Sequence, residues 1–521
     1  MLLIDYFEQV ATGSDKDRPF LHFIADDPAS DRMLTYEDAD RACSRYARAL
    51  IACGVSRGHC IAMLQPNSVE WVLWYFAAQK IGAITCALNT DFKRESLADI
   101  VRGARAKVII ADSDHAELAL ALKSECPLID KVLAPESAEG VDAIARFTDA
   151  YEATHLSRAK ALDAEDITAI ILSSGTTGNR PKAIRLSNRA LIKGNGAYLS
   201  AVPVSATDKV LIVTPIFHSC TLAWAITASV MRGATIVLAA RFSSSRFWEQ
   251  ADRSRASILW TMGTIIHILL KLPRTPNEAA VASRIGWIFA AGMGKRVLDA
   301  KARWPAVHFV DGYGLTESAG TIATDDSFTR ADPFVCVGRP APGIDLRIVD
   351  VASGNDVATR QHGEILLRYG QGFSGYLDND DAMRESVRDG WFHTGDVGYR
   401  DEEGRFYFVD RMKDVIRCGG KNIAASEIEH AYASHPEISE VLALPAPDDV
   451  YGEQVAVVVV PKNPLRRFGI DEMQAYGRSR LAAFKLPQIV LHVVMEDLPR
   501  TPTGKVSKAA LKRMLLTKTE A

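Results

Sequence analysis

The segment Ser173-Ser-Gly-Thr-Thr-Gly-Asn-Arg-Pro-Lys182 decides how the rest of the chain is interpreted. Its backbone N–H groups, its hydroxyls and the Lys182 ammonium are all hydrogen-bond donors, and its two glycines leave room for a polyphosphate to approach. The apolar run of residues 167–172 before it predicts a buried strand from which this loop emerges. We therefore interpret residues 173–182 as a nucleotide-phosphate loop, with a polar surface turn as the alternative.

Two common nucleotide-binding motifs are excluded by single positions. The P-loop of nucleoside triphosphatases has Ser or Thr directly after its lysine, whereas Ala183 follows Lys182 here. The pair Gly312-x-Gly314 does not indicate a dinucleotide-binding fold, because Glu317 occupies the position of the third glycine. A different class of phosphate-binding protein is therefore expected.

The totals of the chain are typical of a soluble globular protein. Its 521 residues are enough for two or more domains. With 48% hydrophobic residues, 24% charged residues and a net charge of −3, it gives no reason to expect nucleic acid or an anionic membrane as a partner. Its eight cysteines form no C-x-x-C pair and no zinc-ligand pattern, which favours the cytoplasm. Acidic residues near Met1 argue against an export signal.

Residues 210–231 are a stretch of 22 residues without a formal charge, which is long enough to cross a bilayer. Pro215, His218 and several hydroxyl residues interrupt it, and its aromatic residues form no belts at the two ends. We therefore expect a buried strand, a turn and a helix here, and no stable membrane insertion.

Helical and strand patterns alternate through the first three hundred residues. Thr35-Tyr-Glu-Asp38 has the form of a capping box, and apolar residues then recur at helical spacing until Gly54. A largely buried helix is expected at residues 71–81. Strands are expected at residues 61–64, 83–88, 108–111, 210–213, 235–238 and 287–289. This alternation predicts layered α/β sheets.

The later part of the chain changes character near Asp410-Arg-Met-Lys-Asp414. Strands at residues 363–368 and 405–409 predict a β-rich part before it, and a compact α+β segment of domain size follows it. The pentapeptide alone would also suit an exposed turn. We expect three parts: an N-terminal domain of residues 1–411, a hinge of residues 412–414, and a small mobile domain of residues 415–521.

Three further segments combine turn-forming residues with groups that suit a nucleotide. In Asp311-Gly-Tyr-Gly-Leu-Thr-Glu-Ser318, a ring beside two glycines can stack on a base while a hydroxyl and a carboxylate bind phosphate and Mg²⁺. Trp391-Phe-His-Thr-Gly-Asp396 sets a carboxylate in a glycine turn suited to ribose hydroxyls, with Arg411 downstream. Leu498-Pro-Arg-Thr-Pro-Thr-Gly-Lys505 presents one lysine on a bent loop. A capping acid, a salt-bridged core aspartate and a solvated lysine are the structural alternatives.

Together and in this order, the four segments resemble the adenylate-forming superfamily, which includes acyl- and aryl-CoA synthetases, luciferases and peptide-synthetase adenylation domains. The resemblance extends from Leu64-Gln-Pro-Asn-Ser68 to Lys505. It implies a large N-terminal domain and a small mobile C-terminal domain that rotates about Lys413. The sequence departs from the family by one additional residue between Gly178 and Pro181, and by Ala183 in place of the usual glycine.

The resemblance also implies roles for individual residues. Tyr313 would lie along adenine, and Asp396 and Arg411 would bind the ribose. Glu317 would bind Mg²⁺, and Lys505 would bridge the substrate carboxylate and the α-phosphate. The implied ATP-binding set is Ser174, Gly175, Thr176, Thr177, Gly178, Lys182, Gly312, Tyr313, Gly314, Thr316, Asp396, Arg411 and Lys505, of which Ser174, Thr176, Thr177 and Lys182 would hold the β- and γ-phosphates and Thr316 would contact the α-phosphate. The implied catalytic set is Lys505, Thr316, Glu317 and Lys182, because preorganised cations stabilise a carboxylate that attacks a phosphate.

A carboxylate is a poor electrophile, and its conversion to acyl-AMP supplies a good leaving group. The segment Gly419-Gly-Lys-Asn-Ile423 resembles the C-terminal loop of CoA ligases, which implies that the thiol of coenzyme A attacks the acyl-AMP. Gly419 and Gly420 would let this loop approach the pantetheine. Because the two half-reactions need different groups at one site, the small domain is expected to exchange Lys505 for this loop.

The acid pocket is expected to lie among the segments 214–218, 260–264 and 290–294 together with Trp224. Its named candidates are His218, Trp224, Gly263, Gly292 and Met293. His218 matches either a gate residue of the family or a satisfied core histidine. Peptide-synthetase domains place an acid beside this segment, and His218-Ser-Cys220 therefore argues against an α-amino acid.

The expected function is an ATP-dependent carboxylate–CoA ligase that uses ATP, Mg²⁺ and coenzyme A on a small-molecule carboxylic acid. Residues 389–411 and Arg246-Phe-Trp248 resemble the carnitine/crotonobetaine-type CoA ligases, so we expect a short or medium-chain, polar acid. One alternative is a stand-alone adenylating enzyme that loads a carrier-protein thiol or an amine. Luciferase-like oxidation and a noncatalytic nucleotide-binding regulator are further alternatives. The sequence leaves a homo-oligomer open.

Overall fold

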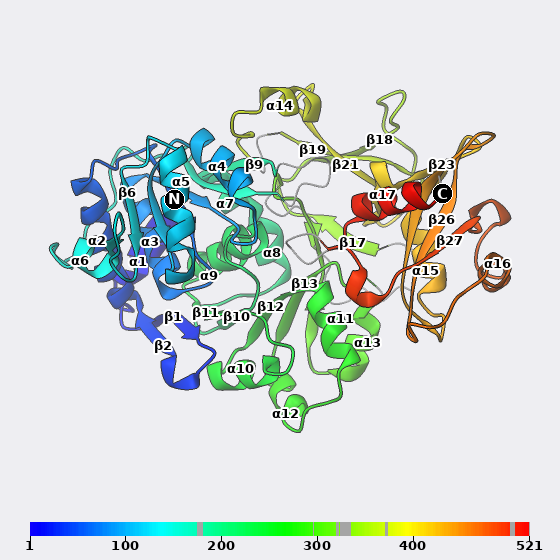
Figure 1. The fold of residues 1–521 in the computed structure, drawn as a ribbon. Helices are drawn as coiled ribbons and strands as arrows, with labels where there is room; N and C mark the ends of the chain where they lie inside the picture. The colour runs from blue at the N-terminus through cyan, green and yellow to red at the C-terminus, as the bar shows by residue number, and fades with distance from the viewer. Residues whose placement is uncertain are drawn as a thin grey trace.

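The four sheets of the protein are formed by segments that alternate with helices along most of the chain (Figure 1). The computed structural model describes residues 1–173, 181–294, 296–318, 322–323, 335–369, 373–500 and 506–519. Among these residues, two sheets have seven strands each, one has eight strands and one has five. The predicted combination of layered α/β sheets, a β-rich part and a smaller α+β part is confirmed.

The first sheet has the strand order β7-β6-β5-β3-β4-β8-β9, and its pairs are parallel except for β8 and β9. Its strands are β3 (Cys60–Leu64), β4 (Ile84–Ala87), β5 (Ala106–Ala111), β6 (Lys131–Ala134), β7 (Asp142–Ala143), β8 (Ile167–Leu172) and β9 (Ala183–Ser187). The accompanying helices are α2 (Tyr36–Ala52), α3 (Val69–Ile81), α4 (Arg94–Gly103), α5 (Ala116–Glu125) and α6 (Ile144–Thr148). The predicted capping box of α2 is confirmed, since Thr35 and Asp38 exchange hydrogen bonds.

The second sheet has the order β14-β13-β12-β10-β11-β1-β2 and is parallel except for β1 and β2. Its strands are β1 (Pro19–Ile24), β2 (Arg32–Thr35), β10 (Lys209–Ile212), β11 (Thr235–Ala239), β12 (Ile258–Met262), β13 (Trp287–Ala291) and β14 (His308–Val310). Its helices are α1 (Leu3–Ala11), α7 (Asn188–Gly194), α8 (Gly196–Ala201), η3 (Cys220–Ile226), α9 (Thr227–Met231), α10 (Phe247–Ser254), α11 (Gly263–Lys271), α12 (Glu278–Ala282) and α13 (Arg296–Arg303). The carboxyl ends of its parallel strands meet at one edge, which is where open α/β sheets bind ligands.

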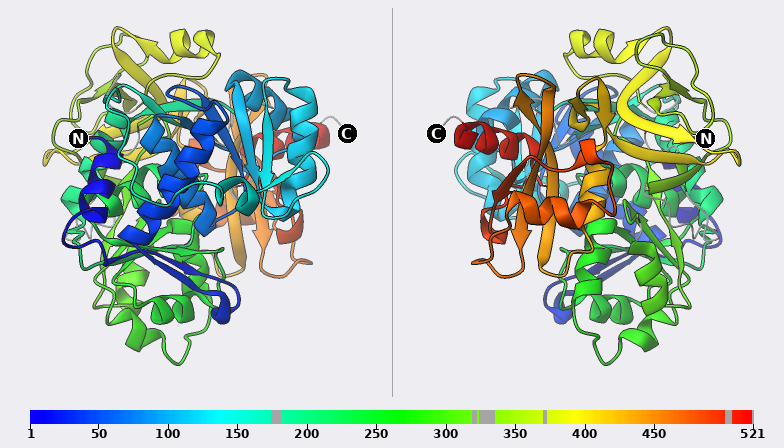
Figure 2. Two further views of the ribbon diagram at one scale, coloured as in Figure 1. Left: turned by 90° about the vertical axis from the view of Figure 1, so that its left-hand side faces the viewer. Right: turned by 90° about the vertical axis from the view of Figure 1, so that its right-hand side faces the viewer.

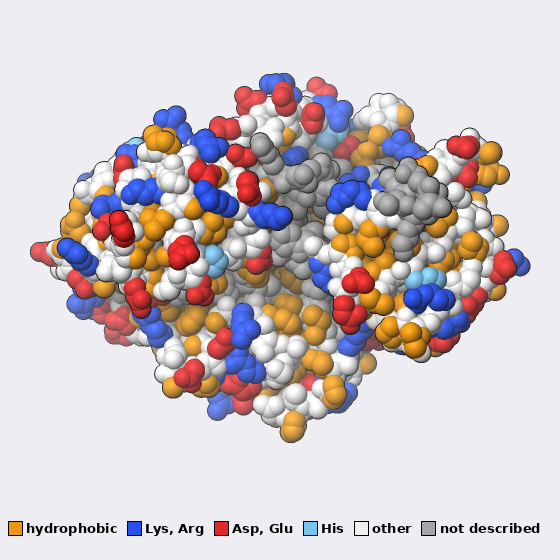
Figure 3. All heavy atoms as spheres, viewed as in Figure 1, with side chains coloured by type: hydrophobic (Ala, Val, Ile, Leu, Met, Phe, Trp, Pro, Cys, Tyr) orange, Lys and Arg blue, Asp and Glu red, His pale blue; other side chains and the backbone are white. Residues whose placement is uncertain are grey.

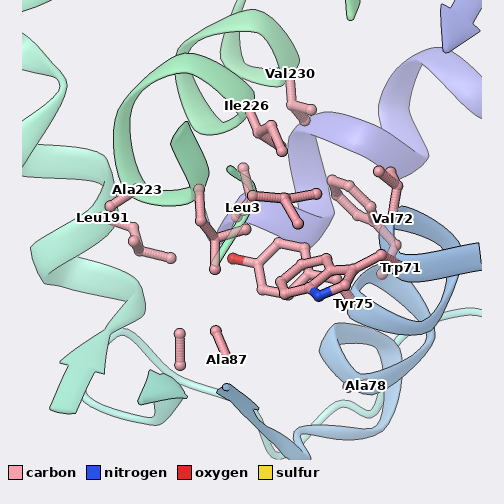
Figure 4. Packing of buried hydrophobic residues seen from close by; sticks show 14 of the residues in the cluster. Leu3, Trp71, Val72, Tyr75, Ala78, Ala87, Leu191, Ala223, Ile226 and Val230 are labelled. Carbon is pink, nitrogen blue, oxygen red and sulfur yellow. The ribbon is translucent and has the colours of Figure 1, made fainter. Parts of the chain in front are cut away.

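A single apolar core joins these two sheets (Figure 4). Leu3 of α1, Trp71 and Tyr75 of α3, Leu191 of α7 and Val230 of α9 pack together in it. The predicted largely buried helix is confirmed as α3. The uncharged stretch forms β10, a turn, the π-helix η3 and α9, as predicted. No helix among the described residues is both long and apolar enough to span a membrane.

The third sheet is the β-rich part, with the order β15-β16-β17-β22-β21-β19-β18 and with β20 paired to β21. Its strands are β15 (Gly312–Tyr313), β16 (Ile322–Ala323), β17 (Val335–Pro340), β18 (Leu346–Val349), β19 (Gly363–Arg368), β20 (Val387–Arg388), β21 (Trp391–Arg400) and β22 (Phe406–Arg411), and α14 (Asp380–Ser386) lies between β19 and β20 in the chain. Strand β22 runs two residues beyond the predicted strand. Asp410 is buried and accepts hydrogen bonds from Arg411 N (2.8 Å) and Ser426 N (2.9 Å), so an exposed turn does not describe this residue.

The strands after the 3₁₀ turn η4 (Met412–Asp414) form a sheet of their own. They are β23 (Ile416–Cys418), β24 (Lys421–Ile423), β25 (Ile438–Asp448), β26 (Gly452–Pro461) and β27 (Ile489–His492), with helices α15 (Ala425–Tyr432), α16 (Ile470–Gly477) and α17 (Lys508–Thr519). This part, coloured orange to red, faces the viewer in the right-hand view of Figure 2. On the face shown in Figure 3, Lys and Arg side chains are interspersed with Asp and Glu.

Lys80 of α3 is a fully buried cation that joins three helices. Its ammonium lies 2.7 Å from Glu8 of α1 and 2.8 Å from Asp40 of α2, and it donates a hydrogen bond to the carbonyl of Leu156 (2.8 Å). Removal of this cation would leave two carboxylates without their buried partner, which is costly because the interior does not solvate them.

We expect Lys80→Ala to lower the free energy of unfolding by about 3–5 kcal/mol, the usual cost of breaking a buried ion pair. Urea denaturation followed by circular dichroism would measure this change. The matched control is Lys131→Ala, because Lys131 pairs with Asp142 at the surface and its loss should cost less than about 1 kcal/mol. Equal effects of the two substitutions would contradict a structural role for the buried cation.

Candidate functional site

Asp396 lies at the centre of a buried polar contact between three strands of the β-rich sheet. The phenol of Tyr313 on β15 donates to Asp396 Oδ2 (2.6 Å), and Arg411 Nε on β22 lies 2.7 Å from Asp396 Oδ1. Burial raises the pKa of Asp396 to about 6, although Arg411 and Tyr313 act in the opposite direction. Three residues predicted to bind adenine and ribose therefore lie in direct contact.

Glu317 and Lys182 meet through an aromatic residue that the sequence analysis missed. The phenol of Tyr376 donates to Glu317 Oε1 (3.0 Å), and the Lys182 ammonium lies 4.7 Å from the centroid of the Tyr376 ring. That distance is within the range of a cation–π contact. Tyr376 is held by a β-bridge to Ile184, and its position after Gly375 in a short turn was the only local sequence feature that could have drawn attention to it.

Thr316 is joined to the predicted acid-binding segment by a second missed residue, Ser219. Ser219 Oγ lies 3.1 Å from Thr316 Oγ1, and either hydroxyl can be the donor. His218 Nδ1 lies 3.0 Å from Cys220 Sγ. Burial raises the pKa of the Cys220 thiol, but the His218 imidazole and neighbouring hydroxyls outweigh burial, so that the pKa is lowered overall.

Asp311 fixes the loop that follows β13 by accepting two backbone hydrogen bonds from it, and it accepts a third from its own neighbour Gly312. Its Oδ1 accepts from Gly292 N (2.6 Å) and Gly312 N (2.8 Å), and its Oδ2 accepts from Gly294 N (3.2 Å). Burial nevertheless raises the pKa of Asp311 to about 6. The sequence analysis quoted Asp311 within a motif without assigning it a role. In the structure it holds the backbone of residues 292–294, which belong to the predicted acid pocket.

Two of the predicted pocket glycines are in close contact. A Cβ atom on Gly263 would lie 2.2 Å from the carbonyl oxygen of Gly292, so residue 263 must be glycine for α11 to begin here. The neighbouring Met293 is almost completely buried and packs into the apolar core of the second sheet.

Aromatic rings form one wall beside this segment. Trp224 makes edge-to-face contacts with Trp260 (6.1 Å between centroids) and Phe289 (5.8 Å), which stack on each other at 4.1 Å. The Nε1 atoms of Trp224 and Trp260 and the hydroxyl of Tyr198 are buried and have no hydrogen-bond partner within the part of the chain that the structure describes. The wall is therefore apolar but carries unpaired N–H and O–H donors.

Asn67 ties the predicted acid-binding segment to the first sheet. Its amide nitrogen donates to the carbonyls of Thr214 (3.1 Å) and Ala239 (2.9 Å), and its amide oxygen accepts from Ile216 N (2.7 Å). Asn67 was quoted in the sequence analysis only as the start of the resemblance.

The candidate residues of the C-terminal part lie in tight turns. Gly419 and Gly420 have φ values of +55° and +75° and form the turn between β23 and β24, where both positions favour glycine. Lys413 lies in η4, and burial lowers its pKa. The candidates Ser174, Gly175, Thr176, Thr177, Gly178 and Lys505 lie outside the described residues.

Glu317 fits the role predicted for it toward Mg²⁺. Its carboxylate uses one oxygen for Tyr376, and no group of three or more His, Cys, Asp or Glu suited to a metal occurs among the described residues. Mg²⁺ is commonly held by one or two carboxylates together with the phosphates of a nucleotide, which matches a single acid here.

Comparisons with known proteins agree with this arrangement. The family model of the AMP-binding enzymes matches residues 7–377, and that of the AMP-binding enzyme C-terminal domain matches residues 427–505. The chain is 29% identical to the long-chain-fatty-acid–CoA ligase FadD13 of Mycobacterium tuberculosis, over 93% of this chain and 94% of the relative. It is 30% identical to the crotonobetaine/carnitine–CoA ligase of Citrobacter koseri, over 92% of this chain and 93% of the relative.

The fold is shared with solved structures as well. The crystal structure of ATP-bound MatB from Rhodopseudomonas palustris superimposes with a TM-score of 0.88 at 23% identity, over 99% of both chains. The two family models and the CoA-ligase relatives confirm the resemblance to the adenylate-forming superfamily. The chain belongs to the family of AMP-binding enzymes.

Proposed function

We propose that the protein is an ATP-dependent carboxylate–CoA ligase that converts an acid, ATP and coenzyme A into acyl-CoA, AMP and pyrophosphate. The observation that carries this proposal is that residues 313–317, shortly after β14, take part in two groups of polar contacts. One group is Tyr313, Asp396 and Arg411, and the other is Lys182, Thr316 and Glu317. Relatives that match over more than nine-tenths of the chain bear the names of CoA ligases, which supports coenzyme A as the acceptor.

In the first half-reaction, the substrate carboxylate attacks the α-phosphorus of ATP and pyrophosphate leaves. Asp396 and Arg411 would hold the ribose, Lys182 the departing phosphates, and Thr316 the α-phosphate. Mg²⁺ held by Glu317 would neutralise phosphate charge when the nucleotide is bound. Ser219 would position Thr316, because the two hydroxyls are in hydrogen-bond contact.

In the second half-reaction, the thiol of coenzyme A attacks the acyl carbon and AMP leaves. Residues 412–414 would act as a hinge between residues 1–411 and 415–521, with Lys413 as the pivot. Rotation would exchange Lys505 for the turn at Gly419 and Gly420. Supporting this proposal, the strands after Ile416 pair only with one another within the described part of the chain.

The substrate is proposed to be a short or medium-chain acid with a polar group. The rings of Trp224, Trp260 and Phe289 pack against one another and form a bulky apolar wall beside the acid segment, which supports an acid of limited length. The N–H group of Trp224, which has no partner among the described residues, can donate to an acceptor on the substrate, and a buried donor without a partner is unfavourable.

Pyrophosphate release from ATP and Mg²⁺ across a panel of carboxylic acids, with and without coenzyme A, tests the proposed reaction. We expect release that depends on the acid, with a mass corresponding to acyl-CoA only when coenzyme A is present. The best acids should be short or of medium length and polar. Release with acyl-AMP and no thioester, or transfer only to a carrier protein or an amine, would contradict the proposed acceptor.

Lys505→Ala separates the two half-reactions. We expect acyl-AMP formation to fall by about 10²-fold or more, the scale for removal of one preorganised electrostatic group. Conversion of supplied acyl-AMP to acyl-CoA should continue, because the turn at Gly419 and Gly420, and not Lys505, is proposed to face the site in this step. The control Lys512→Ala removes a lysine of α17 and should preserve both steps. Equal loss of both steps in Lys505→Ala would contradict the proposed rotation, in which the turn at Gly419 and Gly420 replaces Lys505 at the site.

The ionisation of Asp396 predicts a pH dependence of nucleoside binding. The carboxylate form accepts ribose hydroxyls, and burial raises its pKa to about 6, so affinity should be kept above pH 6 and lost as the pH falls through 6. Tyr313→Phe removes a donor that favours the carboxylate, so the midpoint should move to higher pH. Calorimetric titration with adenosine, which has no phosphate to titrate, measures both effects. An unchanged pH profile in Asp396→Asn would contradict the assignment.

A further inference from the structure

A cavity of about 680 Å³ lies at the carboxyl end of the first sheet. Gln65 follows β3, Ala111 ends β5 and Pro135 follows β6, and all three line this cavity. Strand β4 lies on one side of β3, and β5 and β6 follow on the other side. The direction in which the chain adds strands therefore reverses between the neighbouring strands β3 and β5. Open parallel sheets bind ligands in the crevice at such a reversal. None of the residues assigned above to ATP, the acid or coenzyme A lines this cavity.

The four acids of the cavity already have partners. Asp149 pairs with Arg45, and Asp38 accepts the capping hydrogen bonds of α2. Glu70 pairs with Arg32 at 2.6 Å, and Asp112 accepts from the backbone and side chain of His115. The acidic residues are thus committed to internal contacts.

Several donors of the same cavity are not matched. Gln65 is only 3% exposed; its Oε1 accepts from Ser68 (2.9 Å), but its Nε2 has no partner in the part of the chain that the structure describes. The Nε atom of Arg45 is likewise buried without an acceptor there. Arg41 lies one turn before Arg45 on α2, and it makes no ion pair with any described residue. An unpaired buried amide is unfavourable, so the cavity requires acceptors from elsewhere.

The remaining wall of the cavity is apolar and includes an aromatic ring. Leu34, Ala42, Leu73 and Ile144 line it, together with the ring of Tyr46. The Tyr46 ring is fixed by stacking on Trp74, with 4.2 Å between the centroids. A planar apolar group can therefore lie against a rigid surface while its polar end faces Gln65 and the arginines.

We propose that this cavity binds a small molecule that carries an oxyanion on a flat apolar body, at a site separate from the proposed catalytic centre. The oxyanion supplies the acceptors that Gln65 Nε2 and Arg45 Nε lack among the described residues, and it pairs with the charge of the exposed Arg41. The apolar body contacts Tyr46 and its neighbours. A carboxylate and a phosphate monoester share this chemistry, and the following experiment distinguishes them.

The test is isothermal titration of the full-length protein with 2-naphthoate and with 2-naphthyl phosphate, which share one ring system. We expect one or both to bind, with the tighter probe identifying the headgroup, and the neutral 2-naphthamide to bind at least about ten-fold more weakly because it lacks the charge. Gln65→Leu and Arg41→Gln should each weaken binding of the anion by about ten-fold, the effect of one hydrogen bond to a charged group.

Controls separate this site from the acid pocket. Gln65→Leu and Arg41→Gln should leave kcat/KM for pyrophosphate release with the best acid unchanged, and Arg102→Gln, on the exposed face of α4, should leave probe binding unchanged. Because Arg41 is exposed, its substitution tests the proposal even if Gln65→Leu impairs folding. The proposal is overturned if neither anion binds, or if both anions bind Arg41→Gln as tightly as the unaltered protein.

Discussion

The burial of one carboxylate, Asp396, between a phenol and a guanidinium is the constraint on which the nucleotide site depends. Tyr313 comes from the strand that follows the second sheet, and Arg411 is the last residue before η4. Their common contact therefore joins the segment proposed to bind the base, the acid proposed to bind the ribose and the start of the connection to the C-terminal part. The Asp396 carboxylate is shielded from water, since Asp396 is 1% exposed, whereas the Arg411 side chain stays partly exposed, so the attraction is stronger than that of a pair fully at the surface.

A second theme is the placement of donors that lack acceptors. Most buried polar groups of a protein are paired, so those that are not indicate a ligand or a water molecule. Among the described residues, two groups of such donors lie beside the sites considered above. The indole and phenol donors of the aromatic wall lie next to the proposed acid pocket, whereas Gln65 and Arg45 lie at the first sheet. The two places differ in charge, because only the second contains arginines.

Local features of the fold could be predicted from the sequence. The helix α2 is set by its capping box and its apolar spacing, and α3 and the strands β3, β8 and β13 follow from apolar runs bounded by turn residues. Tyr313, Asp396 and Arg411 were selected by resemblance, and the structure brings them together, while their roles stay predictions. Tyr376 and Ser219 were missed because their partners are 59 and 97 residues away in the chain. Contacts at such separations depend on how the sheets pack, which no local pattern contains.

The three hydrogen bonds of Asn67 have a consequence for how this enzyme can diversify. They fix the backbone of residues 214–216 to the first sheet and to the end of β11. Because these hydrogen bonds hold residues 214–216 in place, the proposed acid pocket cannot widen by movement of these residues without leaving the buried amide of Asn67 unpaired. A change of substrate range would therefore arise most easily by exchanging individual side chains along the wall, such as Trp224. Gene duplicates of this protein could thus acquire new acids by a few point substitutions while the phosphate chemistry stays the same.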